Sequence, residues 1–277
     1  MKLLTANRAN KLLYNFIKVN NITGKVLLPA NVCPDMVKTL AFAGMQHQFL
    51  DLQAETLCMD QQAALAFAKE ASMLIFVHTY GLEVEFSAFF QQLRDQNPDL
   101  IIVDDKCLCL PDLDVKDSAA DLVLYSTGEK KMVNLGGGAI GYLADKWEYD
   151  EVPVEGCDCL SNELWLLDPK QLYLKMDTII AHKEKLNTIY RAMLPEAIQL
   201  PDVYQHWRFN ILVQNKQEIL AALAAEGLVA DSLYPALDAS CLVANNLHAY
   251  VINLYNDKLF TVEQAERACE IILECIE

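Results

Sequence analysis

Two adjacent lysines stand between an apolar run and three glycines. Residues 122–125 are apolar apart from a tyrosine hydroxyl, Ser126 follows, and Lys130 and Lys131 precede Gly136, Gly137 and Gly138. Glycines let a backbone pass close to a bound group. A lysine held in such a site can have its pKa lowered and can attack a carbonyl carbon to form a Schiff base. On its own, the segment equally fits a surface loop with two solvated lysines.

Two carboxylates end a second apolar run. Residues 100–103 are Leu, Ile, Ile and Val, and Asp104 and Asp105 follow them. A carboxylate at the end of a strand can pair with a protonated pyridine nitrogen, the contact that makes pyridoxal phosphate an electron sink. The same pair also fits a cap of the following turn. The acid pair followed by strand, serine and lysine is a more specific combination than either segment alone.

These residues need a scaffold, and the periodicity of the first 145 residues supplies one. Short apolar runs predict strands at 25–28, 48–50, 74–77, 100–103, 122–125 and 139–143, and helical spacing predicts helices starting near residue 36, at 60–71 and at 86–94. Strands that alternate with helices indicate an α/β fold with a mostly parallel sheet. Polar residues just past the strand ends then line the ligand crevice.

The pattern changes after Pro153. Residues 160–194 form a long stretch with helical spacing, typical of the connecting helix of a two-domain enzyme. After it, the sequence predicts strands at 209–213 and 249–254 and helices at 216–226 and 261–276. Thr261 with Gln264 predicts a capping box, and Gly227 a helix end. We therefore predict a large domain over residues 1–180 and a small α+β domain over residues 181–277.

The composition of the chain argues against two classes of binding partner. The 277 residues are 53% hydrophobic and carry a net charge of −16, which repels phosphate backbones and anionic lipids, so neither nucleic acid nor a membrane is an expected partner. No apolar run approaches a membrane span, and the first ten residues lack a signal peptide's apolar region. The nine cysteines include two C-x-C pairs but no zinc-type spacing, so we expect reduced thiols, no metal site and a cytoplasmic location.

Taken in order, the motifs resemble the fold-type I pyridoxal-phosphate enzymes, and within them the DegT/DnrJ/EryC/StrS sugar aminotransferases. The likeness extends over residues 27–34, 43–51, 77–82, 102–105, 126–131 and 207–235. It implies an aspartate-aminotransferase-like fold, with a seven-stranded, mostly parallel sheet in a large domain and a small C-terminal α+β domain. It also implies a homodimer whose active sites lie at the subunit interface.

The resemblance assigns roles residue by residue. Lys131 matches the lysine that forms the Schiff base and then moves a proton, with Lys130 as its solvated neighbour. Asp105 matches the partner of the pyridine nitrogen, with Asp104 as the alternative. The cofactor-binding residues that it implies are Asp105, Ser126, Ala6, Asn7, His78 and Cys33. The expected reaction transfers an amino group from a small-molecule donor to a keto acceptor, a sugar or another small keto compound.

Some positions depart from the family pattern. The phosphate-binding helix start reads Thr5-Ala6-Asn7-Arg8, a stacking aromatic is replaced near Cys33 with Tyr80 as a candidate substitute, and Leu108 replaces a polar cofactor contact. Two other interpretations therefore stay open. One is a different reaction on the same cofactor, such as that of a lyase, decarboxylase or desulfurase. The other is a degenerate, non-catalytic protein that keeps the fold.

Overall fold

A seven-stranded sheet organises the first half of the chain. The computed structural model describes residues 1–160 and 169–276. The strands are β1 (Lys2–Ala6), β2 (Lys25–Pro29), β3 (Gln46–Leu50), β4 (Met73–Val77), β5 (Ile101–Asp105), β6 (Leu122–Ser126) and β7 (Ala139–Leu143). Their order is β1-β7-β6-β5-β4-β2-β3, in which β2 to β6 pair in parallel and β7 runs antiparallel to both of its neighbours. The predicted α/β class is confirmed.

Helices bury both faces of this sheet. Along β4, Met73, Ile75 and Val77 belong to one core and Leu74 and Phe76 to the other, because successive side chains of a strand point to opposite faces. Helices α1 (Ala9–Val19) and α2 (Pro34–Ala43) pack on the first face. Helices α3 (Gln61–Phe67), which continues as a 3₁₀ turn (Ala68–Glu70), and α4 (Ser87–Gln96) cover the second.

Helix α1 shows why the chain folds this way locally. Its fully buried residues Leu12, Leu13, Phe16 and Ile17 recur at helical spacing and form one apolar stripe against the sheet. Burial of each such side chain contributes about 1.5–3 kcal/mol. Leu12 lies close to Gly141 of β7, where an added Cβ would stand 3.1 Å from the leucine Cδ1. The helix N-terminus is thereby held at the edge where β1 ends.

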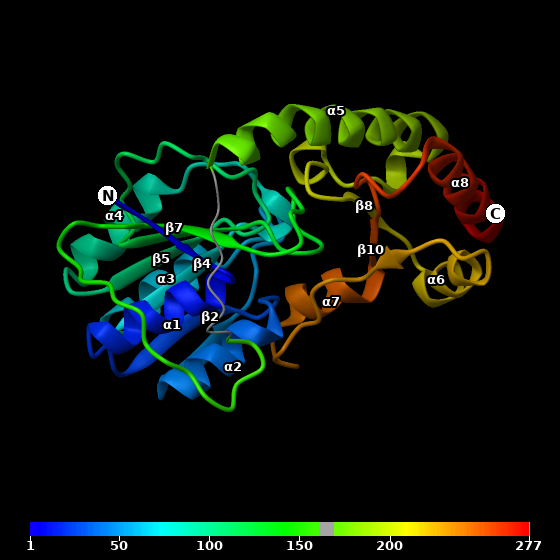
Figure 1. The fold of residues 1–277 in the computed structure, drawn as a ribbon. Helices are drawn as coiled ribbons and strands as arrows, with labels where there is room; N and C mark the ends of the chain where they lie inside the picture. Colours follow the sequence, from blue (N-terminus) through cyan, green and yellow to red (C-terminus); the bar gives the residue numbers. More distant parts are fainter. Residues whose placement is uncertain (161–168, 277) are drawn as a thin grey trace.

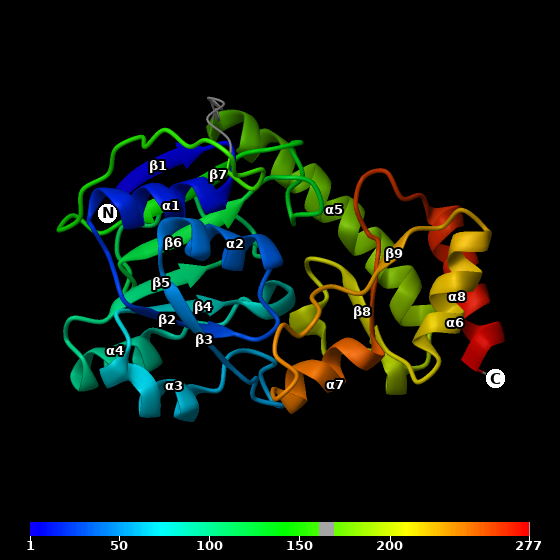
Figure 2. The ribbon, with the colours of Figure 1, turned by 90° about the horizontal axis from the view of Figure 1, so that it is seen from below.

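The second half of the described chain has a sheet and a core of its own. Helix α5 (Pro169–Met193) runs from beside the large sheet to the second one (Figure 1). The second sheet has the order β8-β10-β9, from β8 (Phe209–Leu212), β9 (Ala230–Asp231) and β10 (Val251–Leu254). Helices α6 (Lys216–Ala225) and α8 (Val262–Ile276) pack with α5 around this sheet (Figure 2). The division of the chain at residue 180 stays a prediction.

Helix α7 (Leu242–Tyr250) joins the two parts. The backbone N–H groups of Val243 and Ala244 donate to the carboxylate of Asp51 at 3.0 Å each, and Asp51 directly follows β3 of the large sheet. A carboxylate at a helix N-terminus satisfies free N–H groups and interacts favourably with the helix dipole. Residues from both parts therefore meet near the strand ends of the large sheet.

The element predictions differ from the structure in identifiable places. Helix α7 occupies part of the predicted strand at 249–254, so β10 begins only at Val251. Strands β1 and β9 were not predicted: β1 is mostly exposed or half-buried and so lacks a continuous buried apolar run, and β9 has only two residues. The predicted helix at 160–194 is described only from Pro169, since residues 161–168 lie outside the described part. Among the described helices, none is long and apolar enough to cross a membrane.

Candidate active site

The carboxyl ends of β1, β5 and β6 meet at one edge of the large sheet. Ala139 pairs with Ala6 on one side and Ser126 on the other, so these strand ends lie at the same level. The register continues past β1, where the carbonyl of Asn7 accepts a 2.8 Å hydrogen bond from the Gly138 N–H. The sheet thus brings together residues separated by more than a hundred positions in the sequence.

A cleft of about 840 Å³ opens at this edge. It is lined by five of the seven predicted site residues, Asn7, Cys33, Asp105, Ser126 and Lys131. Ala6 is the last residue of β1 and directly precedes Asn7, but does not itself line the cleft. The other lining residues include Arg8, Lys38, Asp35, Cys107, Glu129, Lys130, Tyr234 and glycines 128, 136 and 137. Lys131 and Asp105, which the sequence analysis combined into one motif, therefore line the same cavity.

The two adjacent lysines differ in environment. Lys130 has a positive φ of 62° and its amine lies 3.3 Å from Asp231, with more than half of the side chain exposed. Its carbonyl accepts a 2.7 Å hydrogen bond from the Trp207 indole. Lys131 instead lies within the electrostatic reach of Asp105 and Cys107 at the base of the cleft. The geometry favours Lys131 as the reactive amine and Lys130 as its paired neighbour.

The expected lowering of the lysine pKa is wrong in this structure. Burial acts to lower the pKa of Lys131, but Tyr234, Cys107, Asp105 and Cys33 act in the opposite direction and together raise it above the usual value. Lys131 therefore rests as an ammonium ion beside an acid, and it must lose a proton before it can attack a carbonyl carbon.

The acid pair is divided between the two faces of the sheet. Asp105 lines the cleft, and its Oδ1 accepts a 2.9 Å hydrogen bond from the Cys107 N–H. Asp104 points to the other face, where its carboxylate lies 2.8 Å from Nε2 of His78. This division follows from the twofold period of a strand. Asp105, and not Asp104, is thus the carboxylate that can meet a ligand in the cleft.

His78 does not line the cleft. Its second ring nitrogen, Nδ1, lies 2.6 Å from the carbonyl oxygen of Leu82, so both nitrogens face protein oxygens. The neighbouring Tyr80, considered as a substitute for the stacking aromatic, packs parallel to Trp207 at 6.0 Å between ring centroids. Leu108 is buried in the core on the same side. The His78, Tyr80 and Leu108 side chains therefore do not line the cleft, although the His78 N–H donates to the Asp105 carbonyl at 3.1 Å.

A set of hydrogen-bond donors suited to an anion lines the same cleft. Ala9 and Asn10 open α1, and the Arg8 side chain at the N-cap makes no capping hydrogen bond in the described structure. The first N–H groups of a helix lack intrahelical acceptors and attract anions. The Ser126 hydroxyl makes only long contacts, 3.5 Å to the Gly138 carbonyl and 3.4 Å from the Gly128 N–H. These donors are available to a phosphate group.

The side chain of Asn7 has a buried polar atom that lacks a hydrogen-bond partner among the described residues. Its Oδ1 is buried and has no hydrogen-bond partner within residues 1–160 and 169–276. Rotation of the amide by 180° exchanges oxygen for nitrogen and places two N–H donors at the same point. The side chain at position 7 can therefore serve an acceptor-rich group in the cleft.

Tyr234 is the lining residue that the sequence analysis missed as a site residue. Burial raises the pKa of its phenol, and the nearby Lys131 opposes that change. It comes from the loop after β9 and so brings a group from the second half of the chain to the lysine. Only long-range packing places it there, although the Tyr-Pro pair at 234–235 was part of the resemblance.

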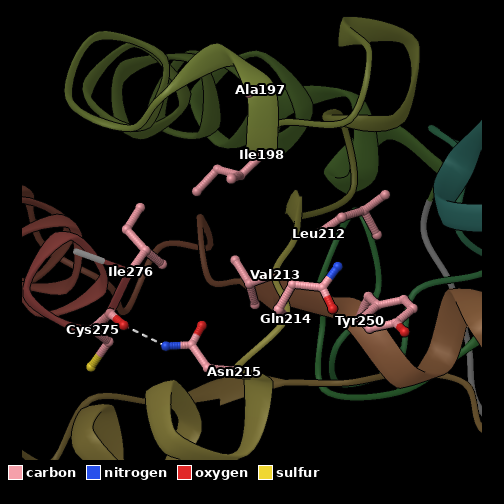
Figure 3. Close-up of a pocket in the computed structure, with 9 residues that line it drawn as sticks. All are labelled: Ala197, Ile198, Leu212, Val213, Gln214, Asn215, Tyr250, Cys275 and Ile276. Atoms are coloured by element: carbon pink, nitrogen blue, oxygen red, sulfur yellow. Dashed lines mark hydrogen bonds between the residues drawn. The ribbon is translucent and has the colours of Figure 1, made fainter.

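A second cavity offers no comparable chemistry. It has a volume of about 520 Å³ and lies between β8, α6 and the end of α8 (Figure 3). Its walls are mainly apolar, with Ile198, Leu212, Val213 and Ile276, and the Asn215 amide donates to the Cys275 carbonyl. Over the described residues, no group of three His, Cys, Asp or Glu side chains could hold a metal ion. The cleft at Lys131 is therefore the candidate active site.

Comparisons with known proteins define the fold. No protein-family model and no curated protein matches the sequence. Among solved structures, a DegT DnrJ EryC1 StrS aminotransferase from Brucella abortus has a TM-score of 0.74 at 15% identity, covering 100% of this chain and 86% of that one. A sugar aminotransferase from Micromonospora echinospora gives 0.73 at 14% identity, with 98% and 87% covered. NtdA from Bacillus subtilis with bound cofactor PMP gives 0.74 at 17%, with 100% and 73% covered. The chain therefore has the predicted fold of type I, which it shares with these proteins.

Proposed function

We propose that the protein is a pyridoxal-phosphate-dependent aminotransferase whose cofactor binds covalently to Lys131. The observation that carries the proposal is the meeting of Lys131 and Asp105 in one cleft that the first residues of α1 also line. The similar structures include two aminotransferases and NtdA with bound cofactor PMP. Their fold and this donor set support the same cofactor here.

The residues present fit the cofactor at each of its polar ends. The Asp105 carboxylate can accept the hydrogen bond of a protonated pyridine nitrogen and, by its charge, keep that nitrogen protonated. The N–H groups of Ala9 and Asn10, the Ser126 hydroxyl and the Asn7 amide can bind the phosphate. When bound, pyridoxal phosphate supplies an electron sink for the carbon that carries the amino group.

Lys131 has two tasks in this proposal. With the cofactor bound, its Nζ would be the atom that holds the group covalently, and the same nitrogen would be placed to take a proton from the substrate carbon and return it. Asp105 and Tyr234 both lie within electrostatic reach of this nitrogen and line the same cleft. The reaction exchanges an amino group between a small-molecule donor and a keto acceptor.

The acceptor is proposed to be a sugar or another small keto compound. The similar protein from Micromonospora echinospora is a sugar aminotransferase. At the mouth of the cleft, Arg8 and Lys38 share Asp35 as their acidic partner, at 4.0 and 2.8 Å, so this wall keeps one positive charge in excess. That charge can contact an anionic group of either substrate, in a protein whose overall charge is −16. As part of the same proposal, the protein acts in the cytoplasm as a homodimer with sites at the subunit interface.

The first test is the visible absorbance of the protein with pyridoxal phosphate. Wild-type protein should gain an absorbance band on addition of the cofactor and lose it when glutamate is added, with release of 2-oxoglutarate. Lys131→Ala should abolish the band, because it removes the amine that lies within electrostatic reach of Asp105 in the cleft. Lys130→Ala, one residue away and paired with Asp231, should keep it.

The result also separates the remaining interpretations. A band that forms but does not respond to glutamate, while another amino acid is decarboxylated or cleaved, would assign a different reaction on the same cofactor. Wild-type protein that never shows the band, even with excess cofactor, would leave a non-catalytic protein with the same fold and would overturn the proposal.

A further inference from the structure

Two cysteines outside the candidate active site lie with their sulfur atoms in contact. The Sγ atoms of Cys157 and Cys159 are 3.0 Å apart. Cys157 is half-buried and Cys159 buried, while Gly156 and Asp158 beside them are exposed. Two thiols so placed need only a small approach to reach the bonding distance of a disulfide, about 2.05 Å. The pair is therefore arranged for closure and reachable from solvent.

A hydrogen-bonded path leads from this pair to the wall of the cleft. Cys159 Sγ lies 3.7 Å from the Thr39 hydroxyl, and that hydroxyl donates a 2.7 Å hydrogen bond to the Asp35 carbonyl. Because the threonine proton is used there, the thiol of Cys159 is the donor to the threonine oxygen. Asp35 and Lys38, on the same turn of α2, line the cleft and lie within electrostatic reach of Cys159.

We propose that Cys157 and Cys159 form a redox-active dithiol that a low-molecular-weight disulfide such as oxidised glutathione converts to an intramolecular disulfide, altering the wall of the cleft through α2. In the first step, the Cys157 thiolate attacks one glutathione sulfur and the other glutathione leaves as a thiolate. In the second, the Cys159 thiolate attacks the sulfur of Cys157 and displaces the second glutathione. Two protein thiols are oxidised, one glutathione disulfide is reduced to two thiols, and the two thiol protons pass to the departing thiolates.

Exposure decides the order of attack. Cys157 is the more accessible sulfur and meets the external disulfide first. Burial, together with the hydrogen bond to Cys157, raises the pKa of Cys159. Cys159 therefore reacts second, by attacking the mixed disulfide that has formed on the adjacent Cys157. A disulfide that spans a single intervening residue closes a small, restrained ring, and strained disulfides are readily reduced. The closed form is therefore reversible.

The other C-x-C pair of the chain is a matched control. Cys107 and Cys109 have the same spacing, but both are buried just after the end of β5, with Cys107 in the wall of the cleft. Cys109 Sγ donates to the Leu82 carbonyl at 3.8 Å, and Cys107 has Asp105 as its partner. Burial raises the pKa of both thiols well above the usual value. Spacing alone thus predicts two reactive pairs, whereas the structure assigns one.

The test is thiol mapping of the whole protein in oxidised and reduced glutathione. After alkylation and digestion, the oxidised sample should contain a peptide with Cys157 and Cys159 unalkylated and lighter by two hydrogens, and reductant should restore both thiols. Cys159→Ser should stop the exchange at glutathione bound to Cys157, whereas Cys107→Ser and Cys109→Ser should leave the mapping unchanged. Full alkylation of Cys157 and Cys159 in the oxidised sample, or closure of the Cys107–Cys109 pair in their place, would overturn the proposal.

The coupling to the cleft has its own readout, which needs no cofactor. Cys33 lines the cleft and occupies the N-cap of α2. Closing the disulfide removes the donor to Thr39, so the alkylation rate of Cys33 should change severalfold between the two forms, as expected for the loss of about one hydrogen bond. An unchanged Cys33 rate beside a formed disulfide would overturn the coupling to α2. Failure of pyridoxal phosphate to bind would count against the proposed function and would leave both thiol results standing.

Discussion

At the scale of single residues, the two aspartates of one strand end have separate tasks. Asp105 lines the cleft and Asp104 holds His78 at 2.8 Å on the opposite face. Under the proposed function, Asp105→Asn removes the charge that would keep the pyridine nitrogen of the cofactor protonated, an effect of about one to three pKa units for a nearby opposite charge. We therefore expect amino-group transfer by this variant to slow at least about tenfold, measured as 2-oxoglutarate release.

The neighbouring substitution provides the control. Asp104→Asn keeps the cleft intact and weakens a buried, charged hydrogen bond, so it should lower the free energy of unfolding by about 1–3 kcal/mol and leave the transfer rate near that of wild type. Urea unfolding and the transfer assay together measure both effects. Equal losses of activity in the two variants would contradict the assignment of Asp105.

The charge on Lys131 sets a pH dependence for cofactor binding. The groups around Lys131 outweigh burial and raise its pKa, so near neutral pH only a small fraction of the amine is free to attack the cofactor aldehyde. Raising the pH by one unit should increase the initial rate of band formation about tenfold, since the free amine grows by that factor below its pKa. Stopped-flow absorbance at several pH values measures this rate. A rate independent of pH would show that Lys131 is already neutral in the free protein.

At the scale of elements, the sequence alone was sufficient to predict the features whose defining contacts join residues that are close in the sequence. The predicted capping box is present: the Gln264 N–H donates to the Thr261 hydroxyl at 3.2 Å and the Thr261 N–H to the Gln264 side-chain oxygen at 2.9 Å. The apolar run that ends in Asp104 and Asp105 likewise predicted β5 within two residues. Both features depend on neighbours in the sequence, so local pattern reveals them.

Elements that depend on distant partners were not predictable in this way. Strand β1 is defined by its pairing with β7, more than a hundred residues away, and α7 begins where Asp51 caps it. The site shows the same limit. Asp105, Ser126 and Lys131 follow from motif order, whereas Tyr234 reaches the cleft through long-range packing and His78 turns away because Asp104 binds its ring. Sequence spacing specifies neither contact.

The capping box gives a prediction for α8. Thr261→Ala removes a side-chain acceptor from the first turn and should lower the free energy of unfolding by about 1 kcal/mol, as N-cap threonines commonly contribute. Thr188→Ala is the matched change within a helix, where the exposed hydroxyl bonds only to the Glu184 carbonyl, and it should alter stability by less than about 0.5 kcal/mol. Thermal or urea unfolding of the two variants compares the positions directly. A similar effect of both would mean that the box adds no stability.

At the scale of the whole molecule, α5 carries a buried lysine into the core of the second half. Lys183 donates to the Trp207 carbonyl and to the Asn256 side chain at 2.8 Å each. Burial, with the positive charge of Arg208 and against the opposing Asp257, lowers the pKa of Lys183 from 10.5 to about 7. Lys183 therefore titrates near neutral pH in the folded protein and far above it in the unfolded chain.

This difference makes global stability rise with pH. Between the folded value of about 7 and the unfolded value of 10.5, the unfolded chain binds one more proton than the folded protein, so raising the pH weakens the unfolded state relative to the folded one. From about pH 7 to about pH 8.5, before cysteines ionise, wild type should gain up to about 1.4 kcal/mol of unfolding free energy per pH unit relative to Lys183→Met. Lys185→Met, an exposed neighbour on α5, should retain the wild-type slope. Parallel pH profiles for wild type and Lys183→Met in urea unfolding would show that the amine stays charged in the core, where Asp257 would then have to outweigh both burial and Arg208.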